Sequence, residues 1–455
     1  MSAFDVLVRG GRVVVADGEP VVADVGILDG AIAEIGPELA GGAADEVDAA
    51  GLLVLPGAVD AHVHLNDPGR AGWEGFATGT AALAAGGTTT AIDMPLNAIP
   101  PTLDGASFDA KVTAAAGAAH VDVALWGGLV PGDLDRLDEL AARGVVGFKA
   151  FMSASGVAEF EAADDLTLVE GMARAAQLGL PVAVHAESDE LTGRLARRAV
   201  AAGRVGVRDY LASRPVIAEL EAIGRAIAFA AETGCALHVV HVSSGRGVAL
   251  VAEARARGVD VTCETCPHYL VLDAQDAERL GAAAKCAPPL RPAAERDALW
   301  DRLLAGDVDL VATDHSPSPA ALKATGDDHF AAWGGIPGAQ TLLTLLHDAG
   351  VVARGLPLGR LAVLTASAPA RRFGLPPAKG TLSVGADADL ALLDSAAEWT
   401  LTRDVLLGRH RLSPFVGRRL RGRVVRTMLR GRTIAREGRL TSGAPGGRVL
   451  RRAVG

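Results

Sequence analysis

The sequence contains little cysteine and no long apolar run. Four cysteines in 455 residues are too few for a disulfide framework, and they favour a reducing compartment. No uninterrupted apolar stretch reaches the roughly 18 residues that a membrane span requires. The first residues also lack the basic segment and apolar run that are typical of a signal peptide. We therefore expect a cytoplasmic protein with no membrane partner.

Aromatic residues and positive charge are also scarce. Phe, Trp and Tyr make up 4% of the residues, and 44 Lys and Arg stand against 54 Asp and Glu, so the formal net charge is −10. Nucleic-acid binding relies on stacking aromatic side chains and a basic surface. We therefore expect a small-molecule substrate and no nucleic-acid partner.

The two ends of the chain differ from its middle. Segments with the pattern of β-strands flank Gly10-Gly11 and Asp29-Gly30 near the start, and Gly431 near the end, and each is a hairpin signal. We therefore predict two domains. A small β-sandwich is formed by residues 1–55 and 372–455, and a larger α/β domain spans residues 56–371.

The middle of the chain alternates short valine-rich apolar runs with alanine-rich helical stretches. There are eight runs, at 58–64, 88–94, 121–127, 145–152, 181–187, 236–243, 259–266 and 308–315. This alternation predicts either a (β/α)₈ TIM-like barrel or a doubly wound open sheet. The count of eight, and the lack of a glycine-rich phosphate loop after the first run, favour the barrel.

Ligand-capable side chains stand at the ends of five of these runs. They are His62 and His64, Lys149, His185, His241, and Asp314. Active sites of such barrels form at the C-terminal ends of the strands, so these side chains predict a common site. His62 and His64 lie two residues apart, so on a strand they face the same side, as a pair of metal-binding imidazoles would.

Lys149 lies in a run that is apolar on both sides. Burial is costly for an ammonium group and lowers its pKa. The neutral amine can react with CO₂ to give a carbamate, whose two oxygens can bridge two cations. Two divalent ions would then slightly exceed the negative charge of the carbamate, Asp314 and a hydroxide. The alternative is a lysine that is salt-bridged at the barrel mouth.

Seven motifs carry a family resemblance. They are GAVDAHVHLNDPGR at 57–70, DMPLNAIPPT at 93–102, GFKAFMS at 147–153, ETCPHYL at 264–270, KCAPPLR at 285–291, TDHSP at 313–317 and WGGIPGAQ at 333–340. Through these motifs, which span nearly the whole predicted barrel in order, the sequence resembles the cyclic amidohydrolases of the amidohydrolase superfamily. The likeness is strongest to the branch that hydrolyses allantoin.

The resemblance implies a site with two divalent metal ions, most simply Zn²⁺. One ion would be held by His62, His64, Lys149 and Asp314, and the other by Lys149, His185 and His241. It also implies that Lys149 is an N6-carboxylysine and that Asp314 is the general acid/base. A hydroxide held between the metals would open the cyclic amide of allantoin to allantoate, a reaction of purine degradation. The family often forms tetramers, so a homotetramer is implied as well.

Several positions bear on the choice of substrate. Asn66 stands where dihydroorotase-like sequences usually carry an arginine for the substrate carboxylate, a group that allantoin lacks. Ala154 stands where hydantoinases and dihydropyrimidinases usually carry a tyrosine. We expect Asn66, Asn97, Ala287 and Pro337 to contact the substrate, although either asparagine could instead be a loop cap. The alternatives are a hydantoinase, dihydropyrimidinase or dihydroorotase, or a non-catalytic structural relative, which the filled ligand positions disfavour.

Other conspicuous residues have simpler expected roles. Cys263 and Cys266 form a single pair inside one run, so we expect packing rather than a metal or redox site. Strand alternation predicts that His238 and His315 point away from the barrel mouth. Asp60 is a candidate for orienting the histidines of the first run.

Overall fold

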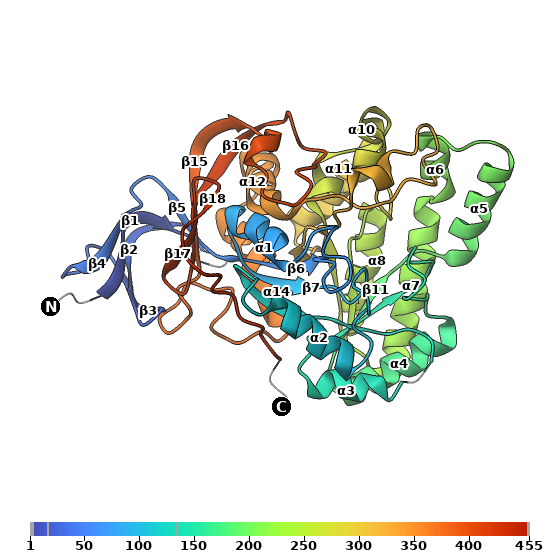
Figure 1. Cartoon of the computed structure of the whole chain (residues 1–455), viewed down its shortest axis with the longest axis horizontal. Helices are drawn as coiled ribbons and strands as arrows, with labels where there is room; N and C mark the ends of the chain where they lie inside the picture. Colours follow the sequence, from blue (N-terminus) through green and yellow to red (C-terminus); the bar gives the residue numbers. More distant parts are fainter. Residues whose placement is uncertain (1–3, 16–17, 133, 453–455) are drawn as a thin grey trace.

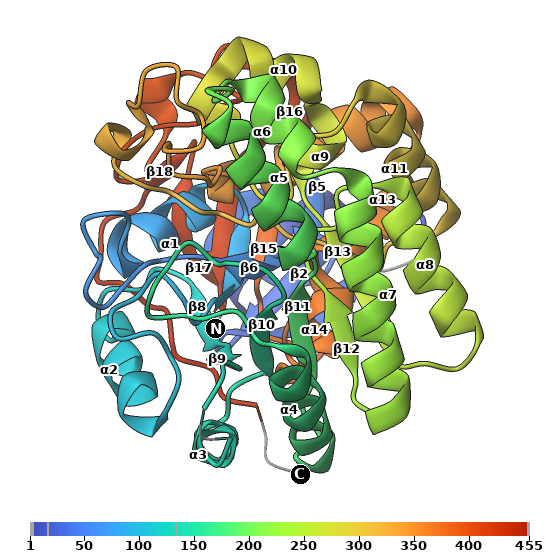
Figure 2. The same ribbon diagram turned by 90° about the vertical axis from the view of Figure 1, so that its right-hand side faces the viewer.

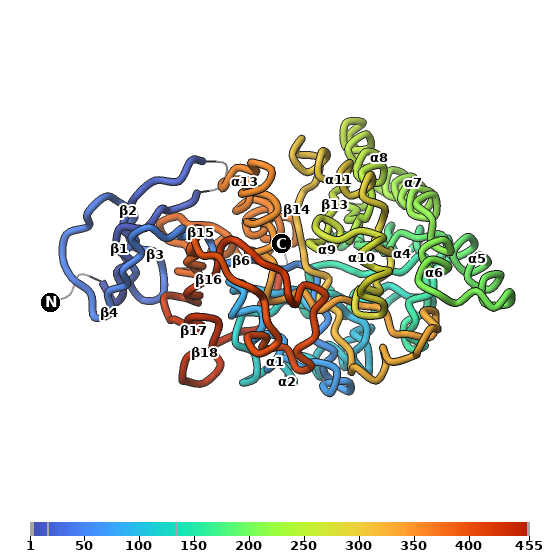
Figure 3. Tube along the Cα trace, turned by 90° about the horizontal axis from the view of Figure 1, so that it is seen from above, coloured from blue at the N-terminus to red at the C-terminus, as the bar shows by residue number. Residues whose placement is uncertain are grey.

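The molecule divides into a barrel and a separate β-sheet. The computed structural model describes residues 4–15, 18–132 and 134–452. The sheet lies at the left of Figure 1 and the barrel at the right, with helices α5 (Asp189–Ala201) and α6 (Val207–Ser213) farthest from the sheet. The same two bodies are seen from above in Figure 3.

The barrel contains a strand in each of the eight predicted runs, in the predicted order. The third strand is split in two by Trp126. The strands are β6 Ala58–Val63, β7 Thr88–Asp93, β8 Asp122–Leu125, β9 Gly127–Gly128, β10 Phe148–Phe151, β11 Val182–His185, β12 Leu237–Val239, β13 Val261–Thr265 and β14 Leu310–Val311.

Pairing between these strands closes the barrel. The strands pair in parallel as β6-β7-β8 and as β9 to β14 in sequence order. Beyond the end of β14, His315 forms a parallel bridge with Val63 of β6, which joins the last strand to the first. The open-sheet alternative is therefore wrong, and the predicted barrel is confirmed.

Helices follow the strands and cover the outside of the barrel, as Figure 2 shows. Caps fix where several begin: the carboxylate of Asp164 accepts from Thr167 N at 2.8 Å, and the Ser244 hydroxyl accepts from Gly247 N at 3.1 Å.

No helix in the described part of the chain is long and apolar enough to cross a membrane. The remaining helices are α1 Phe76–Ala85, α2 Gly105–Ala115, α3 Arg136–Ala142, α4 Asp165–Gln177, α7 Val216–Thr233, α8 Gly245–Ala256, α9 Pro267–Val271, α10 Ala274–Leu280, α11 Ala293–Ala305, α12 Leu342–Leu346, α13 Leu358–Ala362 and α14 Ala368–Arg372, with short helical turns at Gly281–Ala284, Ala320–Lys323, Ala339–Thr341, His347–Val352, Val363–Ser367 and Arg403–Val405.

The second body is one nine-stranded sheet built from both ends of the chain. Strand β5 pairs antiparallel with β15, which joins the two halves. Val8 and Val25 from the first half share a hydrophobic cluster with Leu390 and Met428 from the second, as in a β-sandwich. The strands are β1 Phe4–Val13, β2 Val21–Leu28, β3 Ala31–Gly36, β4 Ala43–Asp48, β5 Leu53–Pro56, β15 Leu390–Thr400, β16 Arg419–Leu429, β17 Arg432–Arg436 and β18 Arg439–Leu440.

The predicted hairpin at Gly10-Gly11 is wrong, because β1 continues through both glycines. Gly10 has a φ of 64°, and its N–H donates to the Asp24 carboxylate at 2.7 Å. A Cβ on Gly11 would lie 2.4 Å from the Val54 side chain. The glycines therefore make a bulge, with a shift in register against β2, instead of a turn. The hairpins at Asp29-Gly30 and Gly431 are confirmed.

The end of the described chain returns to the barrel. Val123 of β8 donates to the Arg448 carbonyl at 2.9 Å and accepts from Leu450 N at 2.8 Å. The predicted boundary at residue 372 assigns this stretch to the smaller domain, but its backbone hydrogen bonds are to a barrel strand.

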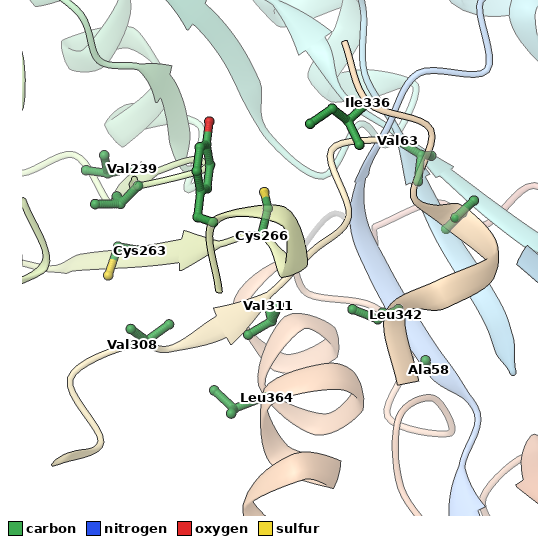
Figure 4. Packing of buried hydrophobic residues seen from close by; sticks show 14 of the residues in the cluster. Ala58, Val63, Val239, Cys263, Cys266, Val308, Val311, Ile336, Leu342 and Leu364 are labelled. Atoms are coloured by element: carbon green, nitrogen blue, oxygen red, sulfur yellow. The ribbon is translucent and has the colours of Figure 1, made fainter. Parts of the chain in front are cut away.

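Cys263 and Cys266 lie among apolar side chains. Figure 4 shows them near Val239, Val308 and Val311 in the hydrophobic cluster around β13 and β14. Both thiols are free and buried, and burial raises the pKa of each. This environment agrees with the predicted packing role.

A buried lysine links the barrel to the sandwich. Lys379 Nζ lies 2.6 Å from Asp122 at the start of β8, and 2.8 Å from both Asp387 and Asp389 just before β15. The three carboxylates are spaced closely enough for a metal ion, but the ammonium group of Lys379 already lies between them. The cluster is therefore a structural ion-pair network between the two bodies.

Replacing Lys379 by methionine is expected to lower the free energy of unfolding by about 3 kcal/mol, because it leaves Asp122 and Asp389 buried without this partner. The thermal midpoint measures the loss. The matched control is Arg194→Met, which breaks an exposed ion pair with Glu190 and is expected to change the midpoint little. Equal midpoints for the two variants would contradict a structural role for Lys379.

Candidate metal centre and active site

The six predicted ligands converge at the C-terminal ends of the barrel strands. Five of them line one pocket of about 420 Å³. These five are His62, His64, His185, His241 and Asp314. The sixth, Lys149, is fully buried on β10. Its Nζ lies 5.0 Å from the ring centroid of Phe151, which itself lines the pocket.

His62, His64 and Asp314 form the first half of the site. One carboxylate oxygen of Asp314 lies 3.3 Å from Nε2 of His62 and 3.3 Å from Nε2 of His64. All three ligand atoms lie within 4.8 Å of one another. Two imidazole nitrogens and a carboxylate oxygen are ligands that Zn²⁺ and similar ions prefer.

His185 and His241 form the second half. Nδ1 of His185 and Nε2 of His241 face each other at 3.0 Å. The other nitrogen of His185 lies 2.9 Å from Glu187, so its proton is held there and Nδ1 is left with a lone pair. Burial lowers the pKa of both histidines, which keeps them neutral. Two neutral nitrogens at this separation can both bind one cation.

Lys149 is the sixth candidate ligand, and its Nζ has no hydrogen-bond partner among the described residues. Burial lowers its pKa to about 7, although Glu264 and Asp314 oppose that effect. A buried, unpartnered amine of this kind is available for reaction with CO₂. Together with the five other donors, it fits a site for two divalent ions.

Unusual backbone conformations aim several of these side chains. Asn66, Asn97, His241 and Asp314 all have positive φ angles, between 40° and 69°. Residues other than glycine rarely adopt this conformation, and it costs about 1–3 kcal/mol where it occurs. Each of the four follows a barrel strand, so the strained backbone redirects side chains at the end of the strand.

His238 was predicted to point away from the barrel mouth, and it does not line the pocket. The strand alternation behind that prediction does not hold, however, because of the backbone turn at His241. Strand alternation places His241 inward and His238 outward. In the structure His238 pairs in register with Ala183 and Thr262 and bonds to Glu264 inside the barrel. His241 reaches the site because the chain turns at φ 40° after β12 ends. His315 does point away from the pocket, toward Glu74.

Two buried carboxylates orient the histidines, and neither was predicted from the sequence. Glu264 of β13 lies 2.5 Å from Nδ1 of His62, and Glu187 holds His185 as described above. Burial alone would raise the pKa of Glu187. The charge of Arg214 and the hydrogen bond from His185 outweigh that effect and bring this pKa to about 2. Asp60, the predicted orienting group, accepts from the backbone N–H of His62 at 3.4 Å and from the backbone and hydroxyl of Thr313.

The four predicted substrate contacts divide evenly. Asn97 and Ala287 line the pocket. Asn97 also lies 3.5 Å from Nδ1 of His64. Asn66 and Pro337 do not line it: Asn66 donates to the carbonyl of Pro317, and Pro337 faces separate, smaller cavities. The structure thus places Asn97 and Ala287 at the pocket, and Asn66 and Pro337 outside its lining.

One wall of the pocket is the segment from Phe330 to Gly335. Two lysines hold its carbonyls, one buried and one half-buried. Lys285 donates to the carbonyls of Phe330 and Ala332, and Lys323 donates to those of Trp333 and Gly335. The segment is thus fixed from behind, and its position shapes the space for a substrate.

The chain matches the Amidohydrolase family over residues 53–434. The chain belongs to this family. The match begins in β5 and ends in β17, so it includes the whole barrel and the C-terminal strands that pair with β5.

Relatives of this amidohydrolase are similar over nearly their whole length. The allantoinase of Rubrobacter xylanophilus is 63% identical over 451 residues, covering 99% of this chain and 98% of the relative. The allantoinase of Solibacter usitatus is 57% identical, covering 98% and 96%. The allantoinase of Deinococcus radiodurans is 54% identical, covering 99% of each chain.

Solved structures share the architecture of this amidohydrolase. The L-hydantoinase (dihydropyrimidinase) from Arthrobacter aurescens has a TM-score of 0.96 at 38% identity, covering 99% of this chain and 100% of its own. The dihydropyrimidinase from Brevibacillus agri has a TM-score of 0.92 at 34% identity, covering 98% of each. The fold class predicted from sequence is thereby confirmed.

Proposed function

We propose that this amidohydrolase hydrolyses the cyclic amide of allantoin to allantoate, a step of purine degradation through ureides. The observation that carries this proposal is the 63% identity to the allantoinase of Rubrobacter xylanophilus over nearly the full length of both chains. The site agrees with it, because it combines metal-ligand geometry with an ionised carboxylate at one pocket.

We assign the metal ligands in two sets, and Zn²⁺ is the proposed ion. His62, His64 and Asp314 would hold one ion, and His185 and His241 the other, with a carbamate on Lys149 between them. The support is the donor geometry described above and the unpartnered Nζ of Lys149.

The reaction requires one proton to move from water to the leaving nitrogen. Metal ions bound here would polarise the scissile carbonyl and lower the pKa of water. Asp314 takes the proton of the attacking water as a new C–O bond forms, and gives it to the ring nitrogen as the C–N bond breaks. The products are a carboxylate and a ureide, and no serine or cysteine nucleophile takes part.

A second candidate is hydantoin or dihydropyrimidine hydrolysis. It is favoured by the TM-score of 0.96 with the L-hydantoinase from Arthrobacter aurescens. Ala154 argues against it, because this residue lines the pocket without the hydroxyl group that those relatives usually place there. Asn97 and Ala287 remain the proposed substrate contacts.

The deciding experiment compares substrates for purified, Zn²⁺-loaded protein. We expect rapid conversion of allantoin to allantoate, with far slower turnover of hydantoin, dihydrouracil and dihydroorotate. Rapid turnover of dihydrouracil or dihydroorotate with none of allantoin would overturn the proposal. Metal analysis of the same sample tests for two ions per chain.

We propose a sandwich domain of residues 1–55 and 372–455 beside a barrel of residues 56–371, with the stretch from Gly447 to Arg452 packed back on the barrel. Residues 1–3, 16–17 and 453–455 of the sandwich, and residue 133 of the barrel, lie outside the described part of the chain. A homotetramer and a cytoplasmic location are also proposed. Light scattering after size exclusion tests the tetramer.

A further inference from the structure

A chain of buried and partly buried hydrogen bonds links side chains of β13 and β12 to His62 of the candidate metal centre. Glu264 lies at its middle and is almost completely buried. One of its oxygens lies 2.5 Å from Nδ1 of His62, and the other lies 3.1 Å from Nε2 of His238. Nδ1 of His238 in turn lies 2.8 Å from the hydroxyl of Thr262.

Glu264 also contacts the second half of the site. The backbone N–H of His241 donates to the same oxygen that faces His62, at 3.3 Å. This bond is made where the φ of His241 is 40°, a conformation that needs support from its surroundings. One carboxylate therefore contacts both halves: the ring of His62 in the first and the backbone of His241 in the second.

The directions of these hydrogen bonds fix the histidine tautomers. An ionised carboxylate only accepts, so His62 and His238 must both donate to Glu264. His62 then keeps a lone pair on Nε2, the nitrogen that faces Asp314. His238 keeps a lone pair on Nδ1, which accepts from Thr262. Each proton has one position, and the ring of His62 is left ready to bind a cation.

We propose that Glu264 and His238 are positioning residues for the metal centre: Glu264 orients His62 and the backbone of His241, and His238, supported by Thr262, orients Glu264. This inference rests on the proposed function, because it needs the two-metal site. Neither Glu264, His238 nor Thr262 lines the pocket, so they act through His62 and His241 and do not touch the substrate.

Glu264→Gln is the central test. A side-chain amide offers one accepting oxygen, so it cannot accept from both His62 and His238. We expect metal affinity to fall about 10- to 100-fold, as for other groups that orient metal-binding histidines. Competition of the metal-free protein with a chromophoric chelator measures the affinity for Zn²⁺ and Co²⁺. The absorption spectrum of the Co²⁺ form reports the ligand geometry independently of activity.

His238→Gln and Thr262→Val test the part of the hydrogen-bond chain that lies beyond Glu264. Glutamine at 238 keeps an amide donor but loses the ring that Thr262 holds in place, and valine at 262 removes the supporting hydroxyl. Each change weakens the support of Glu264, so a loss of roughly fivefold is expected. Thr262→Ser keeps the hydroxyl and is expected to restore wild-type affinity. If His238 acts through Glu264, adding His238→Gln to Glu264→Gln causes little further loss.

His347→Gln is the matched control. His347 is buried, but its ring bonds to the carbonyl of Arg421 in β16 of the sandwich sheet, so its replacement is expected to leave metal affinity and the Co²⁺ spectrum unchanged. Circular dichroism checks that each variant is folded. If Glu264→Gln had the metal affinity and the Co²⁺ spectrum of the wild type, this inference would be overturned and the proposed function would stand. Independent, additive losses would overturn the role of His238. A wild-type protein that binds no divalent ion would overturn the proposed function as well.

Discussion

Replacing Lys149 by methionine is expected to remove most of the bound metal and to lower kcat/KM for allantoin by roughly 10⁴-fold or more. Methionine fills the same fully buried space on β10 but cannot form a carbamate. The second half of the site is then left with His185 and His241 alone. Metal analysis and a steady-state allantoin assay measure the two losses together.

Lys149→Arg separates the carbamate from a simple positive charge. Arginine keeps the charge but does not react with CO₂ at neutral pH, so we expect it to lose as much metal and activity as methionine. An arginine variant with near wild-type activity would show that Lys149 acts as a cation. A ¹³C signal from labelled bicarbonate, present in the wild type and absent from both variants, identifies the carbamate directly.

Because the carbamate forms from the neutral amine, the pKa of Lys149 makes carbamate formation depend on pH. Burial lowers that pKa to about 7, so the reactive neutral amine predominates above pH 7 and declines below it. Loading of metal-free protein with bicarbonate and Zn²⁺ is therefore expected to be fast at pH 8 and to slow as the pH falls below about 7. A loading rate that rises toward acid pH would contradict the role of the neutral amine.

The barrel and the convergence of the candidate ligands could be predicted because strand ends leave a strong local signal. His62, His64, Lys149, His185 and Asp314 each close a short apolar run, and parallel strands bring such ends to one rim of the barrel. The positions of the strands follow from the same runs. No knowledge of side-chain contacts is needed for either step.

The supporting contacts could not be predicted, because they depend on distances between strands. Glu264 lies 202 positions after His62 in the sequence, and nothing in its own run shows that its carboxylate faces that ring. His238 was misplaced because alternation assumes regular strand geometry up to His241, and the positive φ there breaks it. The prediction that Asn66 contacts the substrate used sequence position alone, which does not show that its amide donates to the Pro317 carbonyl.

Replacing Asp314 by asparagine is expected to lower kcat by about 10²- to 10⁴-fold, the range that a positioned acid or base contributes. Burial alone would raise the pKa of Asp314, but the imidazoles of His62, His241 and His64 lower it well below its ordinary value. The carboxylate is therefore ionised at neutral pH and can accept a proton from water. Asparagine keeps one oxygen toward the two histidines and cannot accept that proton.

The pH profile of kcat distinguishes proton transfer by Asp314 from a role in metal binding alone. Because the pKa of Asp314 is lowered, its protonation is expected to reduce wild-type activity only below the ordinary carboxyl range. The asparagine variant, measured after saturation with metal, must rely on hydroxide from solution, so its kcat is expected to rise steadily with pH. The control is Asp309→Asn. Asp309 directly precedes β14, and its carboxylate accepts from Arg255 and from Cys263 N. The pH profile of this variant is expected to match that of the wild type. A metal-saturated Asp314→Asn enzyme with a wild-type profile and rate would show that Asp314 serves only as a ligand, and the proton would then have to pass through another group in the pocket.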